Sequence, residues 1–134
     1  MIAIDTNVLV RVLVDDPGAP DQCRQARELL LAHGSAWIAE IVLVETVWVL
    51  ESAYGFDRTE ILNAIERICE NPALELEAVD RVGAALALYR DSTADFADAL
   101  ILVSAMQRRL ILHTFDRKLA RLGGAQRVVP INPE

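Results

Sequence analysis

Residues 1–13 of this 134-residue chain read MIAIDTNVLVRVL and contain two patterns in succession. Residues 1–5 are short, apolar and rich in β-branched side chains, which predicts a buried first strand that ends at Asp5. Residues 6–13 then place their apolar side chains at helical spacing. A strand that leads directly into a helix is typical of an α/β fold.

The rest of the chain repeats this alternation. After a turn at 15–20 (DDPGAP), the sequence predicts helices at 21–33, 40–54, 58–70, 80–90 and 96–109, and strands at 35–39, 74–78 and 110–114. A helical turn at 116–122 and an extended piece at 127–131 complete the chain. We therefore predict a three-layer α/β/α arrangement around a central parallel sheet of four to five strands, formed by residues 1–134 as a single domain.

The charge of the chain limits how it can meet a nucleic acid. It has 20 acidic and 13 basic side chains, a formal net charge of −7. A protein that binds nucleic acid through charge alone is expected to be basic, so the sequence excludes that class. A nuclease is not excluded, because bound divalent metal reverses the local sign of an acidic site.

Hydropathy and cysteine content indicate a soluble protein. Hydrophobic residues make up 53% of the chain, but the longest apolar stretch, 37–50, is interrupted by Glu40 and Glu45 and is too short to cross a membrane. The first residues lack the basic leader of a signal peptide. Cys23 and Cys69 lack metal-site spacing, so we expect free thiols and a cytoplasmic location.

Four acidic side chains fall where strands end or in the helices beside them: Asp5, Glu45, Asp98 and Asp116. In open α/β sheets, sites form beyond the carboxyl ends of the strands. The mutual approach of these carboxylates would be repulsive without a cation, and hard oxygen ligands suit Mg²⁺ or Mn²⁺. The sequence therefore predicts a metal cleft, with Glu45 of the apolar run VLVETVWVL (42–50) buried beside it.

Several of these acids also have a purely structural explanation. Asp5 and Asp116 each precede a helical stretch and could cap its N-terminus. Asp95 shares a helix face with Asp98, but the run from Ser92 to Asp95 also fits a capping box, so cap and site stay equally open for Asp95.

The remaining candidates have alternatives as well. Glu45 could pair with Arg11 or Arg81, and Thr114 could be an ordinary strand residue. Asp98 lies past the first turn of its helix and has no capping role. Three aromatic residues are expected to pack in the core: Trp37, Trp48 and Phe96.

Five arginines could contact RNA or a partner, although an exposed, solvated position is the favoured interpretation for each: Arg11, Arg24, Arg27, Arg58 and Arg117.

Together the motifs resemble those of PIN-domain ribonucleases, in particular the VapC-type toxins of bacterial toxin–antitoxin pairs. The motifs are IDTNVLVRVL, VLVETVWVL, YGFDR, ADFADALI and HTFDRKLARLGG, in the order and spacing of that family over nearly the whole chain. One departure lies at residues 107–110, QRRL, where the family often has a glycine before the next strand.

The resemblance implies a PIN-like fold and a metal-dependent endoribonuclease, with Mg²⁺ or Mn²⁺ as cofactor and products that carry 5′-phosphate and 3′-hydroxyl ends. It implies an RNA substrate, a cognate VapB-type antitoxin that binds near the helices at 21–33 and 58–70, a homodimer and no membrane. The implied catalytic and metal-binding residues are Asp5, Glu45, Asp98 and Asp116, and the implied supporting residues are Asp95, Asn7 and Thr114.

Other classes fit the residues less well. A haloacid-dehalogenase-like phosphatase needs a second Asp two residues after the first, where this chain has Asn7. A response-regulator receiver needs a phosphoacceptor Asp at a mid-chain strand end, and none is present. A PIN-like module that only binds an antitoxin or RNA remains the alternative, although such a module has no need for the full acidic set.

Overall fold

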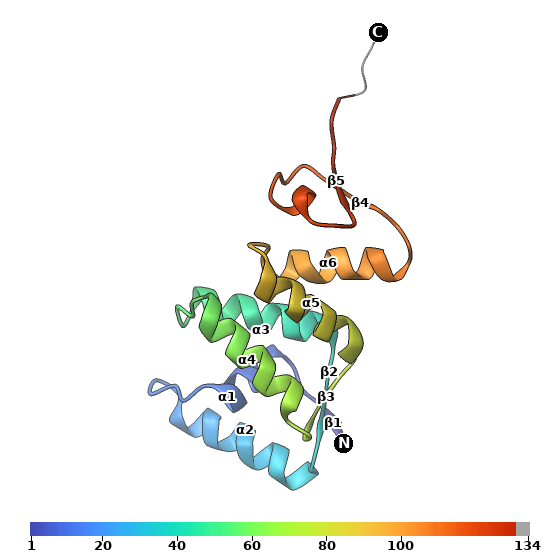
Figure 1. Ribbon diagram of the computed structural model, residues 1–134. Coiled ribbons are helices and arrows are strands. Elements are labelled where there is room, and N and C mark those ends of the chain that lie inside the picture. Colours follow the sequence, from blue (N-terminus) through green and yellow to red (C-terminus); the bar gives the residue numbers. More distant parts are fainter. Residues whose placement is uncertain (131–134) are drawn as a thin grey trace. The chain divides into compact units, whose positions relative to one another are not determined.

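The computed structural model describes residues 1–130, which group into two compact units. The first unit comprises Met1–Val79, and the second begins at Asp80. Each unit has its own sheet and its own packed side chains, and each is described by itself (Figure 1).

The first unit contains three strands and four helices. In chain order these are β1 (Ile2–Ala3), α1 (Thr6–Leu13), α2 (Pro20–His33), β2 (Ala36–Ile38), α3 (Glu40–Ser52), α4 (Arg58–Glu70) and β3 (Leu74–Leu76). The strands form a parallel sheet in the order β1-β2-β3, with Ile2 opposite Ala36 and Ala36 opposite Leu74.

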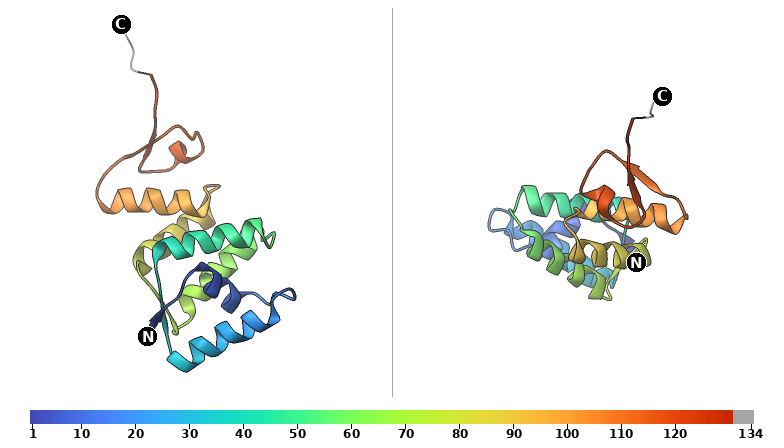
Figure 2. Two further views of the ribbon diagram at one scale, coloured as in Figure 1. Left: turned by 180° about the vertical axis from the view of Figure 1, so that it is seen from behind. Right: turned by 45° about the horizontal axis from the view of Figure 1, so that its top comes forward.

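Burial in the first unit follows the periodicity of each element. Ala36 and Ile38 of β2 are buried while Trp37 between them is 37% exposed, as strand alternation requires. α1 packs against both α2 and α3, and the view from behind in Figure 2 shows it between them. The largest fully buried side chains of this unit are Leu9, Ile38, Leu43, Leu50, Ile61, Ile65 and Ile68.

The second unit contains α5 (Val79–Asp91, whose first residue closes the first unit), α6 (Phe96–Gln107), β4 (Leu112–Thr114), the 3-10 helix η1 (Leu119–Arg121) and β5 (Ala125–Arg127). β4 and β5 pair in parallel. A small core of Ala94, Leu102 and Leu119 is surrounded by Leu88, Leu112, Leu122 and Ala125.

The structure confirms the α/β class and the predicted helices, and all strand pairs among residues 1–130 are parallel. The five strands of these residues pair as a sheet of three and a sheet of two, where we expected one central sheet. The last strand is Ala125–Arg127, earlier than the predicted 127–131, and residue 131 lies outside the described residues. A single domain for residues 1–134 stays a prediction. Cys23 and Cys69 are free thiols, as expected.

No helix within residues 1–130 has the length and apolar character needed to cross a membrane.

At residues 107–110 (QRRL), where the family often has a glycine, an arginine adopts the backbone conformation that favours glycine. Arg109 has a φ of 59°, the left-handed conformation that glycine usually supplies after a helix. The amide of Arg109 donates to the carbonyl of Met106 at 2.9 Å, and the amide of Leu110 donates to the carbonyl of Ala105 at 2.9 Å. These two bonds form a Schellman motif that ends α6, with arginine in the position that favours glycine.

We expect Arg109→Gly to raise the free energy of unfolding by about 1 kcal/mol, because the left-handed conformation is strained for a residue with a Cβ. Urea denaturation of the variant and the wild-type protein measures this difference. Arg108→Gly is the matched control. Arg108 has an ordinary φ of −93°, so its replacement should lower stability by about 0.5 kcal/mol. Equal effects of the two substitutions would contradict the assignment of strain to Arg109.

Candidate active site

Asp5 begins α1 as its N-cap. Its Oδ1 accepts a hydrogen bond from the amide of Val8 at 3.1 Å, and its backbone is extended (ψ −176°). The cap interpretation of Asp5 is therefore confirmed. Asn7, exposed in the first turn of the same helix, lies two residues away.

Glu45 is exposed on α3, and the expectation that it is buried was wrong. The buried face of α3 is formed by Leu43, Thr46, Val47 and Leu50, which recur at helical spacing and leave Glu45 outside that stripe. The alternative pairing with Arg11 is not formed within the first unit, where Arg11 pairs with Asp16.

A polar network joins α1 to the segment that follows α3. The guanidinium of Arg11 lies 3.0 Å from Asp16 and donates to the hydroxyl of Tyr54 at 2.6 Å and to Gln22 at 3.0 Å. The Tyr54 hydroxyl donates to Asp16 at 2.7 Å. This bond, with help from the amide of Gly18 and from Arg11, lowers the pKa of Asp16, and it raises the pKa of Tyr54. The network fixes α1, and hence Asp5, against the helix that carries Glu45.

This network was missed at the level of sequence. Asp16 lies in the DDPGAP turn and Tyr54 in the YGFDR motif, 38 positions apart, and only the fold brings them together. A second long-range contact caps α3, where the Glu77 carboxylate accepts a hydrogen bond from the amide of Glu40 at 2.8 Å. The residue before α3 is Ala39, which has no side chain able to cap, so local sequence gives no signal for this bond.

Asp95 is the N-cap of α6, and its Oδ1 accepts a hydrogen bond from the amide of Asp98 at 2.8 Å. Cap and site were equally open for Asp95, and the cap that the structure shows differs from the predicted capping box. In the predicted capping box Ser92 would begin the helix, whereas its hydroxyl accepts from the amide of Ala94 at 3.3 Å and donates to the carbonyl of Leu88 at 2.7 Å. Ser92 therefore closes the preceding helix, and Asp95 itself opens α6.

Asp116 is fixed from two directions. Its Oδ1 accepts hydrogen bonds from the amides of Lys118 at 2.8 Å and Leu119 at 3.0 Å. Its own amide donates to the hydroxyl of Thr114, the last residue of β4, at 3.0 Å. Thr114 is thus more than an ordinary strand residue, because its side chain anchors the backbone of Asp116.

Asp98 is the perturbed carboxyl of this group. It lies in the first turn of α6, not past that turn as expected, because the helix begins only after Asp95. It is half-buried, and burial raises its pKa, with further contributions from the negative charges of Asp95 and Asp116. The second unit therefore brings three of the predicted acids into electrostatic contact. Asp5 and Glu45 belong to the first unit.

The backbone hydrogen bonds of these aspartates leave one carboxylate oxygen of each able to bind a cation. Asp5, Asp95 and Asp116 each use only Oδ1 for backbone bonds, and their Oδ2 atoms have no hydrogen-bond partner among residues 1–130. The side chain of Asp98 accepts no hydrogen bond from these residues. Cap and ligand are therefore compatible roles.

A donor set of carboxylate oxygens fits the chemistry of Mg²⁺ or Mn²⁺, and a cation beside Asp98 would offset the repulsion that raises its pKa. Within residues 1–130, however, no three His, Cys, Asp or Glu side chains are arranged to hold a metal ion. The four predicted ligands are divided between the two units, and their convergence on one ion stays a prediction.

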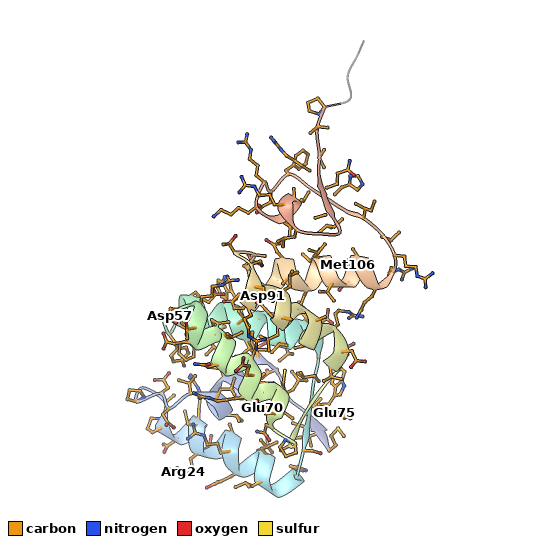
Figure 3. All side chains as sticks on the ribbon, viewed as in Figure 1. Arg24, Asp57, Glu70, Glu75, Asp91 and Met106 are labelled. Carbon is orange, nitrogen blue, oxygen red and sulfur yellow. The ribbon has the colours of Figure 1, made fainter. Side chains whose placement is uncertain are left out.

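We expect Asp98→Asn to raise the melting temperature in the presence of EDTA. A raised carboxyl pKa means that the charged form destabilises the fold at neutral pH. This penalty shrinks as the pH falls through the folded-state pKa and is absent below the unfolded value near 3.8. Scanning calorimetry at pH 7.5 and pH 4 should show a gain at pH 7.5 that fades at pH 4. Glu75→Gln, at an exposed position on β3 (Figure 3), is the control and should show no such gain. A lower melting temperature for Asp98→Asn at pH 7.5 would contradict the repulsion.

Comparison with known proteins gives the family. Residues 2–125 match the model of the PIN domain. A VapC ribonuclease of Aquifex aeolicus (strain VF5) is 27% identical over 125 residues, which cover 92% of this chain and 93% of that protein. The match extends through both units and includes all the predicted site residues. The resemblance noted from the motifs is confirmed, and the chain belongs to the PIN domain family.

Proposed function

We propose that the chain is a VapC-type endoribonuclease toxin that hydrolyses RNA phosphodiester bonds with Mg²⁺ or Mn²⁺ and is inhibited by a cognate VapB-type antitoxin. Membership of the PIN domain family and the similarity to a VapC ribonuclease support the class. The observation that supports the proposal is the group of Asp95, Asp98 and Asp116, in which burial, and then the charges of Asp95 and Asp116, raise the pKa of Asp98.

The proposed roles are those that the resemblance implies. Asp5 and Asp98 would hold the metal directly, and Glu45 and Asp116 would hold it directly or through water. A bound metal would supply an activated water and would stabilise charge on the phosphate oxygens. Attack of that water on phosphorus, in line with the leaving 3′-oxygen, would give 5′-phosphate and 3′-hydroxyl ends.

Supporting residues keep the ligands in place. The Oδ1 bonds of Asp5 and Asp116 to backbone amides fix their rotamers, so the remaining oxygen of each is preoriented. Asp95 does the same for the start of α6, and Thr114 holds the backbone of Asp116. Asn7 follows Asp5 closely enough to orient a ligand or a substrate phosphate.

We place the antitoxin at α2, consistent with the expected binding region. A surface depression of about 480 Å³ is lined by both polar and apolar residues of the turn before α2 and of α2 itself. Leu31 at its edge is 82% exposed, and Cys23 lies at its base. An amphipathic segment could cover this apolar surface and pair with its charged rim. A homodimer and a cytoplasmic location remain predictions.

We expect Asp98→Asn to reduce RNA cleavage by at least about 100-fold, because it removes a charged metal ligand. The assay uses purified protein, freed from antitoxin, with total bacterial RNA and Mg²⁺ or Mn²⁺, followed by mapping of the RNA ends. EDTA should abolish the cuts. Glu75→Gln should cleave like the wild-type protein.

Undiminished cleavage by Asp98→Asn would contradict the site assignment. If the folded wild-type protein makes no cuts with either metal, the alternative function is favoured, in which the chain is a PIN-like module that binds antitoxin or RNA without catalysis.

A further inference from the structure

Phe115 is an exposed aromatic side chain beside the candidate site. It is 82% exposed, whereas Tyr89 and Phe96, the other aromatic residues of the second unit, are 3% and 1% exposed. Tyr89 and Phe96 contact each other edge to face with ring centres 6.1 Å apart and belong to the core. Phe115 makes no ring contact within residues 1–130 and has no packing role that explains its size.

The backbone on both sides of Phe115 is held by hydrogen bonds. The carbonyl of Thr114 accepts from the amide of Val128 at 2.7 Å, which joins β4 to the end of β5. The Thr114 hydroxyl accepts from the amide of Asp116, and the Asp116 carboxylate accepts from the amide of Leu119, the first residue of η1. An exposed ring on a fixed backbone loses little conformational entropy when it binds a partner.

Basic side chains surround this position. Four of them are exposed, and none forms an ion pair within residues 1–130: Arg117, Lys118, Arg121 and Arg127. Arg127 lies opposite Thr114 in the register of β4 and β5, so its backbone is about 4.8 Å from the residue before Phe115. Figure 3 shows nitrogen-tipped side chains gathered around β4, η1 and β5.

The local charge is the reverse of the charge of the whole chain. Residues 112–130 contain four basic side chains and one acidic side chain, Asp116, a formal charge of +3 in a protein of −7. These features match a single-stranded nucleic acid. Its bases can stack on the exposed ring, and its anionic phosphates can contact the basic side chains. A duplex does not offer an unstacked base, and an acidic peptide gives no reason for the ring.

We propose that Phe115 stacks on a base of single-stranded RNA while Arg117, Lys118, Arg121 and Arg127 contact its backbone, which places an adjacent phosphodiester beside Asp116 and Asp98. The inference rests on the proposed function for the RNA substrate, and it adds where the strand lies. Asp116 follows Phe115 directly, and Asp98 belongs to the same unit, so the base contact adjoins the candidate carboxylates.

Fluorescence anisotropy with a labelled 12-nucleotide single-stranded RNA tests this surface. All proteins carry Asp98→Asn and the buffer contains EDTA, so that binding is measured without cleavage. Adding Phe115→Ala should raise Kd about 10-fold, and Phe115→Trp should retain or improve binding, since base stacking is sequence-tolerant. Lys118→Ala combined with Arg121→Ala should flatten the dependence of log Kd on log salt by roughly 1 to 2. Ile101→Ala, an exposed apolar residue on α6, is the matched control and should bind like the parent.

Equal Kd values for RNA in the parent and in the Phe115→Ala variant would overturn the inference. A Phe115→Ala variant that binds the antitoxin more weakly but binds RNA with unchanged affinity would also overturn it.

A different result would contradict the proposed function. If Phe115→Ala weakens RNA binding but the wild-type protein cleaves no RNA with Mg²⁺ or Mn²⁺, the RNA surface stands and the nuclease does not. In an active enzyme, Phe115→Ala alone should raise KM with little change in kcat.

Discussion

The candidate site depends on one interaction, the hydrogen bond from a first-turn backbone amide to one oxygen of an aspartate. Asp5 and Asp95 begin α1 and α6 in this way, and Asp116 accepts similar bonds from the amides of Lys118 and Leu119 at the start of η1, at 2.8 to 3.1 Å. The bond satisfies amides that a helix leaves unpaired and holds the carboxylate in one orientation. Because each carboxylate has two oxygens, the same residue can stabilise a helix and present an anionic ligand.

This arrangement sets stability against function. Asp98 lies half-buried beside Asp95 and Asp116, and burial and repulsion both raise its pKa. Without a cation, a neutral side chain there would suit the fold better. The carboxylate of Asp98 therefore carries a destabilising charge that a bound cation would relieve, as expected of a functional position.

Sequence patterns predicted the elements well because helix periodicity and capping residues act locally. They predicted less where contacts are distant. The Arg11, Asp16 and Tyr54 network and the cap of Glu77 on α3 join residues far apart in the chain. Apolar content alone was misleading for α3, where Glu45 is exposed and Trp48, expected in the core, is 68% exposed. Asp5, Asp95 and Asp116 could be singled out because each follows a strand or precedes a helical segment, but spacing cannot show whether the acids of the two units bind one ion.

The proposed function requires Asp5 and Asp98 to bind the same metal ion, and Mn²⁺ binding measured in a double-mutant cycle tests this requirement most directly. Titration by electron paramagnetic resonance would compare the wild-type protein with Asp5→Asn, Asp98→Asn and the double variant. A shared ion predicts that each single change weakens Mn²⁺ binding and that the double variant loses much less than the two losses added together. Wild-type affinity in Asp5→Asn, with binding lost only in Asp98→Asn, would contradict a site shared by the two units.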